Sequence, residues 1–359
     1  MKALFLCPNL GGGGAERHWS ILLPGLRDLG IDVSVATLDG RGEFYYVLQQ
    51  AGIPATSFAD LGRRGLVAAL RSLRAADADL IITHATSADG LGMLATRGRP
   101  TKWVVNWHYP DGLPLAPRRV LILRGSLPLA DAVLAVSHSQ VTELLNYGAR
   151  RKAIHVIHNG TDFADGIANR LATRCELGLI DTDIAVLLAG RFDEQKRVDI
   201  FLESLVLAQR RQPSIVGLVA GSGPLDAELR RQAEDAAVNV RFLGRRKDMQ
   251  ELIGAADVLA LTSDHEALPY VVLEAMAGGR PIVATSVGAV PEVVTPEVGI
   301  TVPPRDVDAF ATALVKLAED SALRLVLGSA ARRRQQHAFS ATAMCNSYAE
   351  VISRLAGSG

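Results

Sequence analysis

The chain has 359 residues, 48% of them hydrophobic and 21% charged, which fits an ordinary globular protein of two domains. Lysine plus arginine and aspartate plus glutamate both count 38, so the charge balance gives no reason to expect a nucleic-acid partner. No apolar run reaches the roughly 18 residues that span a bilayer and the start is too short for a signal peptide, so we expect a cytoplasmic protein.

Short apolar runs alternate with helical patterns along the chain, which is the βαβ rhythm of a parallel sheet. In the first half we expect strands at 3–7, 33–37, 80–83, 103–106, 132–136 and 154–157. The rhythm repeats at 185–189, 215–220, 240–243, 258–261, 281–284 and 299–302. The stretch from Asn159 to about Asp181 has no clear strand and carries turn residues, which makes it the expected linker. The sequence therefore predicts an α/β protein with two doubly wound domains.

A glycine run, Gly11 to Gly14, follows the first expected strand, where a doubly wound sheet binds ligands. It is not the dinucleotide fingerprint, because Glu16 or Arg17 occupies the third glycine position, and no Gly-Lys-Ser or Gly-Lys-Thr makes it a phosphate loop. Two interpretations stay open. The run is either a turn that needs positive φ or a place where the backbone approaches donor phosphates or acceptor closely.

Two cations follow the first strand of the second half. Arg191 and Lys196 lie in the loop after the apolar run 185–189. Arginine offers a planar fork and lysine a point charge, so together they can stabilise a leaving diphosphate. Alone, each would read more simply as a solvated charge at a strand end.

Two carboxylates bracket a later loop and helix. Glu266 precedes Pro269, a residue favoured in a first helical turn, and Glu274 lies about two turns inside the expected helix. Free N–H groups at a helix start attract phosphate, and carboxylates accept hydrogen bonds from hydroxyls. This pattern predicts a ligand with phosphate and sugar parts, although surface positions for both glutamates stay open.

These motifs, in this order and at these intervals, resemble the retaining glycosyltransferases of family 4, which have the two-domain GT-B fold. The match spans nearly the whole chain. The residues that carry it are Gly13-Gly-Ala-Glu16, His108 in Val-Val-Asn-Trp-His, Val136-Ser137, His158-Asn-Gly-Thr-Asp162, Gly190-Arg191 with Lys196, Gly221-Ser-Gly-Pro224, and Glu266 to Glu274 followed by Ala275-Met-Ala-Gly-Gly-Arg-Pro281.

The resemblance implies two Rossmann-like domains that face each other across a cleft. Residues 1–165 would form the acceptor-binding domain, and residues 166–339 the domain that binds the nucleotide-sugar donor. The last stretch, 340–357, has a helical pattern, and in the family the final helix crosses back onto the first domain. Retention of configuration is likewise carried over from the family.

The resemblance also assigns roles in the second domain. Arg191 and Lys196 would stabilise the leaving diphosphate, Glu266 would contact hydroxyls of the donor sugar, and Glu274 would bind the ribose. In the segment Glu266-Ala-Leu-Pro269, which would bind the donor through Ala267 and Leu268 as well, Ala267 replaces a glycine common in the family. This departure puts the identity of the sugar in doubt. A second departure is Arg197, which stands where many members carry glycine and either adds a cation near the site or faces solvent.

In the first domain, His108 matches a family histidine beside the donor sugar and β-phosphate, against the alternative of a structural histidine. Gly13 and Gly14 are expected to bind the donor. Glu16 and His84 are acceptor-binding candidates, and for His84 the structural alternative weighs equally. The remaining histidines have no metal-ligand spacing.

We expect no metal and no cofactor. The sequence does contain an Asp-x-Asp motif, Asp181-Thr-Asp183, but it precedes a strand at the end opposite the expected ligand face. A solvated turn is therefore the expected role of this segment.

Two basic and apolar segments, 63–74 and 118–129, are candidates for peripheral contact with the inner membrane face. The first has the pattern of an amphipathic helix, with Leu66, Leu70 and Leu73 on one side. An ordinary surface helix is the alternative in each case.

We therefore expect a retaining glycosyltransferase that moves a sugar from a nucleoside diphosphate sugar, with UDP preferred and GDP as the alternative, to a hydroxyl of a glycan, lipid-linked or small-molecule acceptor. Two alternatives stay open. One is a nucleotide-sugar epimerase of the same fold, and the other is a noncatalytic protein that binds sugar nucleotides.

Overall fold

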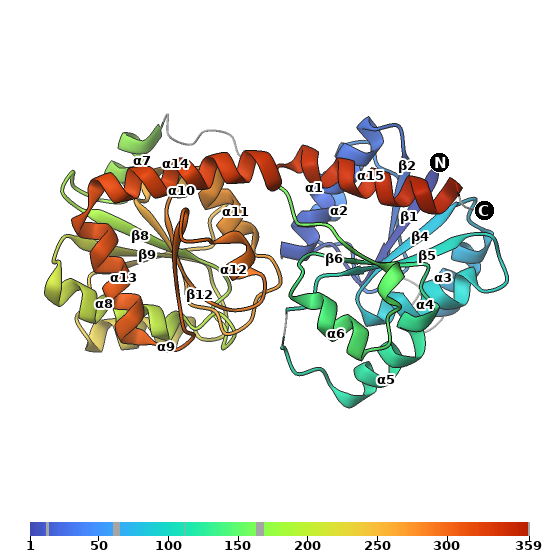
Figure 1. Ribbon diagram of the computed structural model, residues 1–359, viewed down its shortest axis with the longest axis horizontal. Helices are drawn as coiled ribbons and strands as arrows, with labels where there is room; N and C mark the ends of the chain where they lie inside the picture. The colour runs from blue at the N-terminus through green and yellow to red at the C-terminus, as the bar shows by residue number, and fades with distance from the viewer. Residues whose placement is uncertain (12–13, 60–64, 111, 163–168, 358–359) are drawn as a thin grey trace. The chain divides into compact units, whose positions relative to one another are not determined.

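The computed structural model describes residues 1–11, 14–59, 65–110, 112–162 and 169–357. The chain divides into two compact units, each with its own parallel sheet (Figure 1). Unit 1 comprises Met1–Gly160 and the segment from Ser340 on, and unit 2 comprises Thr161–Phe339. The boundary therefore lies after Gly160, whereas the sequence placed it after residue 165, in a stretch outside the described residues.

Unit 1 is built on a seven-stranded sheet in the order β3-β2-β1-β4-β5-β6-β7. Its strands are β1 Lys2–Cys7, β2 Asp32–Thr37, β3 Ala55–Ser57, β4 Leu80–His84, β5 Lys102–Trp107, β6 Ala132–Ala135 and β7 Ile154–Val156. Its α-helices are α1 Gly14–Asp28, α2 Glu43–Gln50, α3 Gly65–Ala75, α4 Thr86–Thr96, α5 Pro117–Ser126, α6 Gln140–Asn146 and α15 Ala341–Gly357. The sequence missed β3, because three residues without an apolar run carry no strand pattern.

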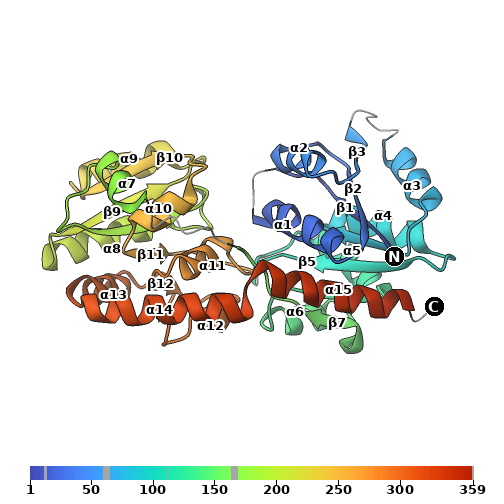
Figure 2. The ribbon, with the colours of Figure 1, turned by 90° about the horizontal axis from the view of Figure 1, so that it is seen from above.

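Helices cover both faces of this sheet, which explains why its strands read as continuous apolar runs. Phe5 of β1 packs with residues of α1 and α15, whereas its neighbour Leu6 packs with residues of α3 and α4. The final helix α15 runs beside α1 (Figure 2). There Gly25 permits the close approach, since a Cβ atom in its place would lie 2.4 Å from the Sγ atom of Cys345.

Unit 2 is built on a six-stranded sheet in the order β10-β9-β8-β11-β12-β13. Its strands are β8 Ile184–Ala189, β9 Ile215–Ala220, β10 Val240–Gly244, β11 Val258–Leu261, β12 Ile282–Thr285 and β13 Gly299–Val302. Its helices are α7 Arg170–Glu176, α8 Val198–Arg211, α9 Asp226–Asp235, α10 Met249–Ala255, α11 Tyr270–Ala277, α12 Val290–Val293, α13 Val307–Glu319 and α14 Ser321–Ala338.

The expected linker, 159–181, contains a packed helix. Arg170 and Arg174 of α7 reach Asp257, with N–O distances of 2.6 and 3.1 Å, and both also donate to backbone carbonyls of the α10 end. The interpretation of the whole stretch as a linker was therefore wrong, because α7 is anchored to unit 2.

Each sheet reverses its strand order once, between β1 and β4 in unit 1 and between β8 and β11 in unit 2. Parallel doubly wound sheets bind ligands outside the carboxyl ends of their strands at such a switch point. The loops after these strands carry most of the residues singled out in the sequence. Within the described ranges, no helix combines the length and the apolar character needed to cross a bilayer.

Candidate functional site

The loop between β8 and α8 presents Arg191 and Lys196 at the switch point of unit 2. The Nε atom of Arg191 lies 2.6 Å from Oδ2 of Asp193, and its side chain is 72% exposed. Asp193 also accepts a hydrogen bond from the backbone N–H of Lys196, at 3.2 Å. This carboxylate therefore fixes the turn between the two cations while the guanidinium stays accessible to an anionic ligand.

Glu266 lies in the loop between β11 and α11 and is buried. Its Oε1 atom accepts hydrogen bonds from Nζ of Lys196 and from Oγ of Ser263, both at 2.6 Å. A buried carboxylate needs such partners, because desolvation without them is costly. The structure thus brings together Lys196 and Glu266, which are 70 residues apart in the chain. No role was predicted for Ser263 from the sequence.

Hydrogen bonds to backbone carbonyls tie the two loops to each other. The N–H of Asp264 donates to the carbonyl of Gln195 at 2.9 Å, and Nε2 of Gln195 donates to the carbonyl of His265 at 2.8 Å. In addition, Oγ1 of Thr262 donates to the carbonyl of Lys196 at 3.0 Å. These bonds fix the loop that carries Lys196 against the loop that carries Glu266.

Two glycines let other backbone segments approach these loops. A Cβ atom on Gly221 would lie 1.8 Å from the carbonyl oxygen of Gly190, and one on Gly288 would lie 1.8 Å from that of Glu266. Both glycines have positive φ, at 149° and 50°. The sequence motif included Gly221 but missed Gly288, whose only signal is its place after a strand of unit 2.

Glu274 is buried in α11. Pro269 occupies the N-cap position, directly before the first turn in which the sequence placed it. The helix begins at Tyr270, so Glu274 lies one turn inside it and not two. Before the helix, Leu268 is buried, and the carbonyl of Ala267 accepts a hydrogen bond from the N–H of Ala289 at 3.2 Å. Glu266 and Glu274 therefore lie on either side of the start of α11.

In unit 1, His108 follows β5 and packs into a cluster of aromatic side chains. Its ring centroid lies 4.4 Å from that of His18 on α1 and 5.5 Å from that of His84 at the end of β4. The Nδ1 atom of His84 lies 3.3 Å from the carbonyl oxygen of Asn106. His18, which was not predicted from the sequence, lies one turn inside the helix after the glycine run.

Burial lowers the pKa of two histidines of this cluster, His18 and His108. Burial, together with the neighbouring His84, lowers the pKa of His18 to about 3. Burial also lowers the pKa of His108 well below its ordinary value, and His18 and His84 lower it further. A neutral imidazole acts on a ligand through a hydrogen bond and not through an ion pair. Asn106, whose carbonyl oxygen lies near His84, also accepts a hydrogen bond at Oδ1 from the hydroxyl of Tyr348 on α15, at 2.7 Å.

The glycine run is only partly described. Gly14 is the first residue of α1, whereas Gly13 and the side chain of Glu16 lie outside the described part of the chain. The roles expected of these residues therefore stay predictions.

The Asp-x-Asp segment forms a turn before β8. The Oδ2 atom of Asp183 accepts a hydrogen bond from the N–H of Ile180 at 2.9 Å, at the amino end of the strand. Among the residues that the structure describes, no group of three histidine, cysteine or acidic side chains is placed to hold a metal ion.

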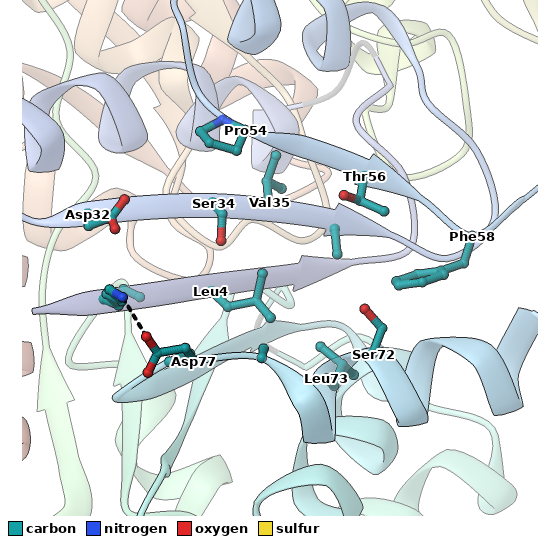
Figure 3. A pocket seen from close by; sticks show the side chains of 15 residues that line it. Leu4, Asp32, Ser34, Val35, Pro54, Thr56, Phe58, Ser72, Leu73 and Asp77 are labelled. Carbon is teal, nitrogen blue, oxygen red and sulfur yellow. Dashed lines mark hydrogen bonds and ion pairs between the residues drawn. The ribbon is translucent and has the colours of Figure 1, made fainter.

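A cavity of about 370 Å³ lies elsewhere in unit 1, between the sheet and α3 (Figure 3). Its lining includes Lys2 and Asp32, the first residues of β1 and β2, and an ion pair of 2.5 Å joins Lys2 to Asp77. The lining runs from these residues at the amino ends of the strands to Phe58, just after β3, and it includes none of the candidate site residues. We therefore do not assign this cavity to the substrate.

Comparison with known families matches the two halves of the chain separately. The sequence model described as "Glycosyltransferase Family 4" matches residues 12–165. The model described as "Glycosyl transferases group 1" matches residues 183–320. Together the two matches cover both sheets apart from β1, and they include the segments that carry Arg191, Lys196, Glu266 and Glu274.

Curated relatives agree with these matches. The chain is 28% identical over 376 residues to the D-inositol 3-phosphate glycosyltransferase of Kribbella flavida, covering 92% of this chain and 88% of that protein. It is 35% identical over 173 residues to the GDP-mannose-dependent monoacylated alpha-(1-6)-phosphatidylinositol monomannoside mannosyltransferase of Corynebacterium glutamicum. That second match spans 46% of this chain and only 45% of the relative.

Among solved structures, the chain is similar to Anabaena HepE in complex with UDP-glucose. The TM-score is 0.85 at 26% identity, and the match covers 99% of this chain and 100% of the other.

Proposed function

Because this chain belongs to family 4 of the glycosyltransferases and has their GT-B fold, we propose that it transfers a hexose from a nucleoside diphosphate sugar to a hydroxyl acceptor with retention of configuration. One observation carries this proposal. At the switch point of unit 2, a lysine and a buried carboxylate share one hydrogen-bonded arrangement, with 2.6 Å between Nζ of Lys196 and Oε1 of Glu266. Such a pair suits a ligand in which phosphate and sugar hydroxyls adjoin.

The roles of the side chains follow from their charge and position. Lys196 and the exposed Arg191 stabilise the negative charge that develops on the leaving diphosphate. Glu266 accepts a hydrogen bond from a sugar hydroxyl, which orients the anomeric carbon. Glu274, on the far side of the helix start, accepts from the ribose of the nucleotide.

The reaction breaks the bond between the anomeric carbon and the diphosphate oxygen, and the diphosphate leaves with the electron pair. The acceptor oxygen then bonds to the same face of that carbon, and its proton passes to the departing diphosphate. No side chain is assigned as a covalent nucleophile. The protein contributes orientation and charge stabilisation, which suffice for large rate effects when the groups are held in place.

In unit 1, we assign to His108 a hydrogen bond to the donor, made by a neutral imidazole, since burial keeps its pKa low. Gly13 and Gly14 are assigned to the donor, and His84 and Glu16 to the acceptor hydroxyl. These assignments rest on the family resemblance. The assignment of His84 is also supported by its place beside His108 in the histidine cluster.

We prefer UDP as the nucleotide of the donor. Support comes from Anabaena HepE, which was solved with UDP-glucose, whereas the corynebacterial relative is named as dependent on GDP-mannose. Thermal-shift screening with UDP, GDP, ADP and TDP separates these cases, because a ligand at 100 times its Kd stabilises the folded state by about 2.7 kcal/mol. A larger shift with GDP than with UDP would reverse the preference.

Peripheral membrane contact is a second part of the proposal, and α5 supports it best. Leu121 on α5 and Leu129 just after it are 73% and 59% exposed, and Arg118, Arg119 and Arg124 are exposed around them. Exposed leucines with basic neighbours suit a surface of anionic lipid.

The other basic segment differs from expectation. On α3 Leu73 is buried, whereas Leu66 is exposed, so the three leucines do not share one environment. Residues 63 and 64 of this segment lie outside the described ranges.

Activity measurements distinguish the proposal from its rivals. The purified chain is incubated with UDP-glucose or GDP-mannose, without and with hydroxyl acceptors, and the sugar products are identified. An epimerase changes the sugar nucleotide without any acceptor. A noncatalytic binding protein leaves it intact in both cases, whereas a transferase releases the nucleoside diphosphate and forms a new glycoside.

A further inference from the structure

Arg197, directly after Lys196, has a left-handed backbone conformation with φ 48° and ψ 48°. Residues with a Cβ atom rarely adopt this conformation, because the side chain crowds the following carbonyl. Arg197 caps the start of α8 in this state. Glycine would adopt this conformation without strain. We therefore expect the arginine side chain to make a contact that offsets the strain of its backbone.

The guanidinium of Arg197 makes two ion pairs. Its NH2 nitrogen lies 2.7 Å from Oδ2 of Asp199, and its NH1 nitrogen lies 3.3 Å from Oδ2 of Asp264. Of the two alternatives that the sequence left open, exposure to solvent is wrong, since only 20% of this side chain is exposed. The charge is held inside the loop structure beside the candidate site.

A second arginine with a left-handed backbone conformation binds the same carboxylate. Arg305, with φ 64°, lies in the loop after β13 and contacts Asp264 through two nitrogens, at 3.1 and 2.7 Å. The hydrogen bond from Arg305 lowers the pKa of the Asp264 carboxyl, burial partly opposes this, and Arg197 adds to the lowering. Asp264 is therefore ionised at neutral pH and is held by two cations.

Asp264 lies two residues before Glu266 in the loop between β11 and α11. Its N–H donates to the carbonyl of Gln195 in the loop after β8. The charged contacts among Arg197, Asp264 and Arg305, which we call the Asp264 clamp, thus join the loops after β8, β11 and β13. Because the clamp acts on the backbone that leads into Glu266, it bears on where that carboxylate is presented.

We propose that the Asp264 clamp is a positioning device of the donor site: Arg197 and Arg305 fix the backbone of residues 263–266 so that the Glu266 carboxylate meets the sugar. None of the three residues is catalytic, since they act through Glu266. This inference rests on the proposed function for its kinetic consequence, but the order of the loop can be measured without any substrate.

The test compares Arg197→Gly with a matched control. Glycine relieves the strained backbone and removes the guanidinium, whereas Ala237→Gly relieves another left-handed residue of unit 2, with φ 50°, outside the clamp. We expect Arg197→Gly to lower kcat for the intact donor about tenfold while the affinity for UDP or GDP alone is unchanged. Asp264→Asn should show the same defect, and the double variant should be no worse, because both changes break one device.

Hydrogen exchange of the backbone amides 263–268 measures the local order of this loop directly. It should be faster than wild type in Arg197→Gly and Asp264→Asn, and unchanged in Ala237→Gly. If Arg197→Gly does not fold, Arg305→Ala removes the other half of the clamp at a side chain that is 66% exposed.

Wild-type exchange and wild-type kinetics in Arg197→Gly and Asp264→Asn would overturn the clamp. A wild-type protein that transfers no sugar would instead overturn the proposed function, and faster exchange in the clamp variants would still support the structural role.

Discussion

The Nζ atom of Lys196 lies 2.6 Å from Oε1 of Glu266, although the two residues belong to loops that follow different strands, β8 and β11. These strands are neighbours at the point where the order of the sheet reverses. A phosphate that binds Lys196 is therefore delivered next to a carboxylate that can hold a sugar hydroxyl. Removal of the lysine leaves Ser263 as a hydrogen-bond donor to that carboxylate.

Lys196→Ala and Arg191→Ala should each lower turnover substantially. Loss of one donor to developing charge costs about 3–4 kcal/mol in favourable sites, or 100- to 1,000-fold in rate. The matched control is Lys316→Ala, an exposed lysine in the last turn of α13, away from these loops. Steady-state kinetics with the donor checks this expectation. Wild-type turnover in both site variants would refute their assignment.

Activity should persist in excess EDTA, with at most a modest effect of magnesium. The reason is that Lys196 and Arg191 are assigned the neutralisation of the diphosphate that a metal would otherwise supply. Donor turnover is measured before and after chelation. Complete loss of activity that only manganese or magnesium restores would contradict this assignment.

Vesicles that contain phosphatidylglycerol should bind the protein in a salt-sensitive way through α5. Burial of a leucine contributes about 1.5–3 kcal/mol, so Leu121→Asp should weaken cosedimentation at least tenfold. Leu325→Asp is the matched control, since Leu325 on α14 of unit 2 is 72% exposed. Equal binding of both variants, or no binding by the wild type, would exclude a role for α5.

Acid should destabilise unit 1 through its buried histidines. The folded-state pKa of His18 is about 3, below the ordinary value of 6.5, so only the unfolded chain takes up the proton between these values. Stability is thus fully present above about pH 6.5 and falls as the pH drops below it, by at most about 1.4 kcal/mol per pH unit for each such histidine.

Urea unfolding at pH 7.5 and 5.5 measures this effect. Fluorescence reports on unit 1, because Trp19, Trp103 and Trp107 are the tryptophans of the whole sequence. Burial raises the pKa of Asp89 to about 7, which acts in the opposite direction, so wild type is compared with His18→Asn. The variant should lose less stability at pH 5.5 than the wild type does. An equal loss would show that His18 does not contribute.

The sequence predicted the architecture because both sheets are parallel and buried on both faces, which turns strands into apolar runs that can be read directly. Strand β3 and helix α7 lacked this signal. The first is three residues long, and the second is anchored by Arg170 and Arg174 through contacts to Asp257, more than 80 residues away. No local pattern reports such a contact.

The candidate site was predicted in part for a similar reason. The sequence allowed four charged residues to be selected, because charged side chains at strand ends and helix starts can bind ligands there. These residues are Arg191, Lys196, Glu266 and Glu274. His18, Ser263, Gly288 and Arg305 were missed, since their roles depend on neighbours that only the folded chain supplies. Arg197 stands where many members of the family carry glycine, yet its left-handed backbone was not predicted.

The most direct test of the donor site is a calorimetric titration of UDP and GDP into wild type, Glu274→Ala and Glu266→Ala, paired with turnover of the intact donor. Glu274→Ala should weaken binding of the bare diphosphate about 10- to 100-fold, the range for one hydrogen bond to a charged group. Glu266→Ala should bind it like wild type but turn over the donor about 100-fold more slowly. Loss of diphosphate affinity in Glu266→Ala with retention in Glu274→Ala would reverse the placement of the donor along α11, and no binding by the wild type would contradict the donor site itself.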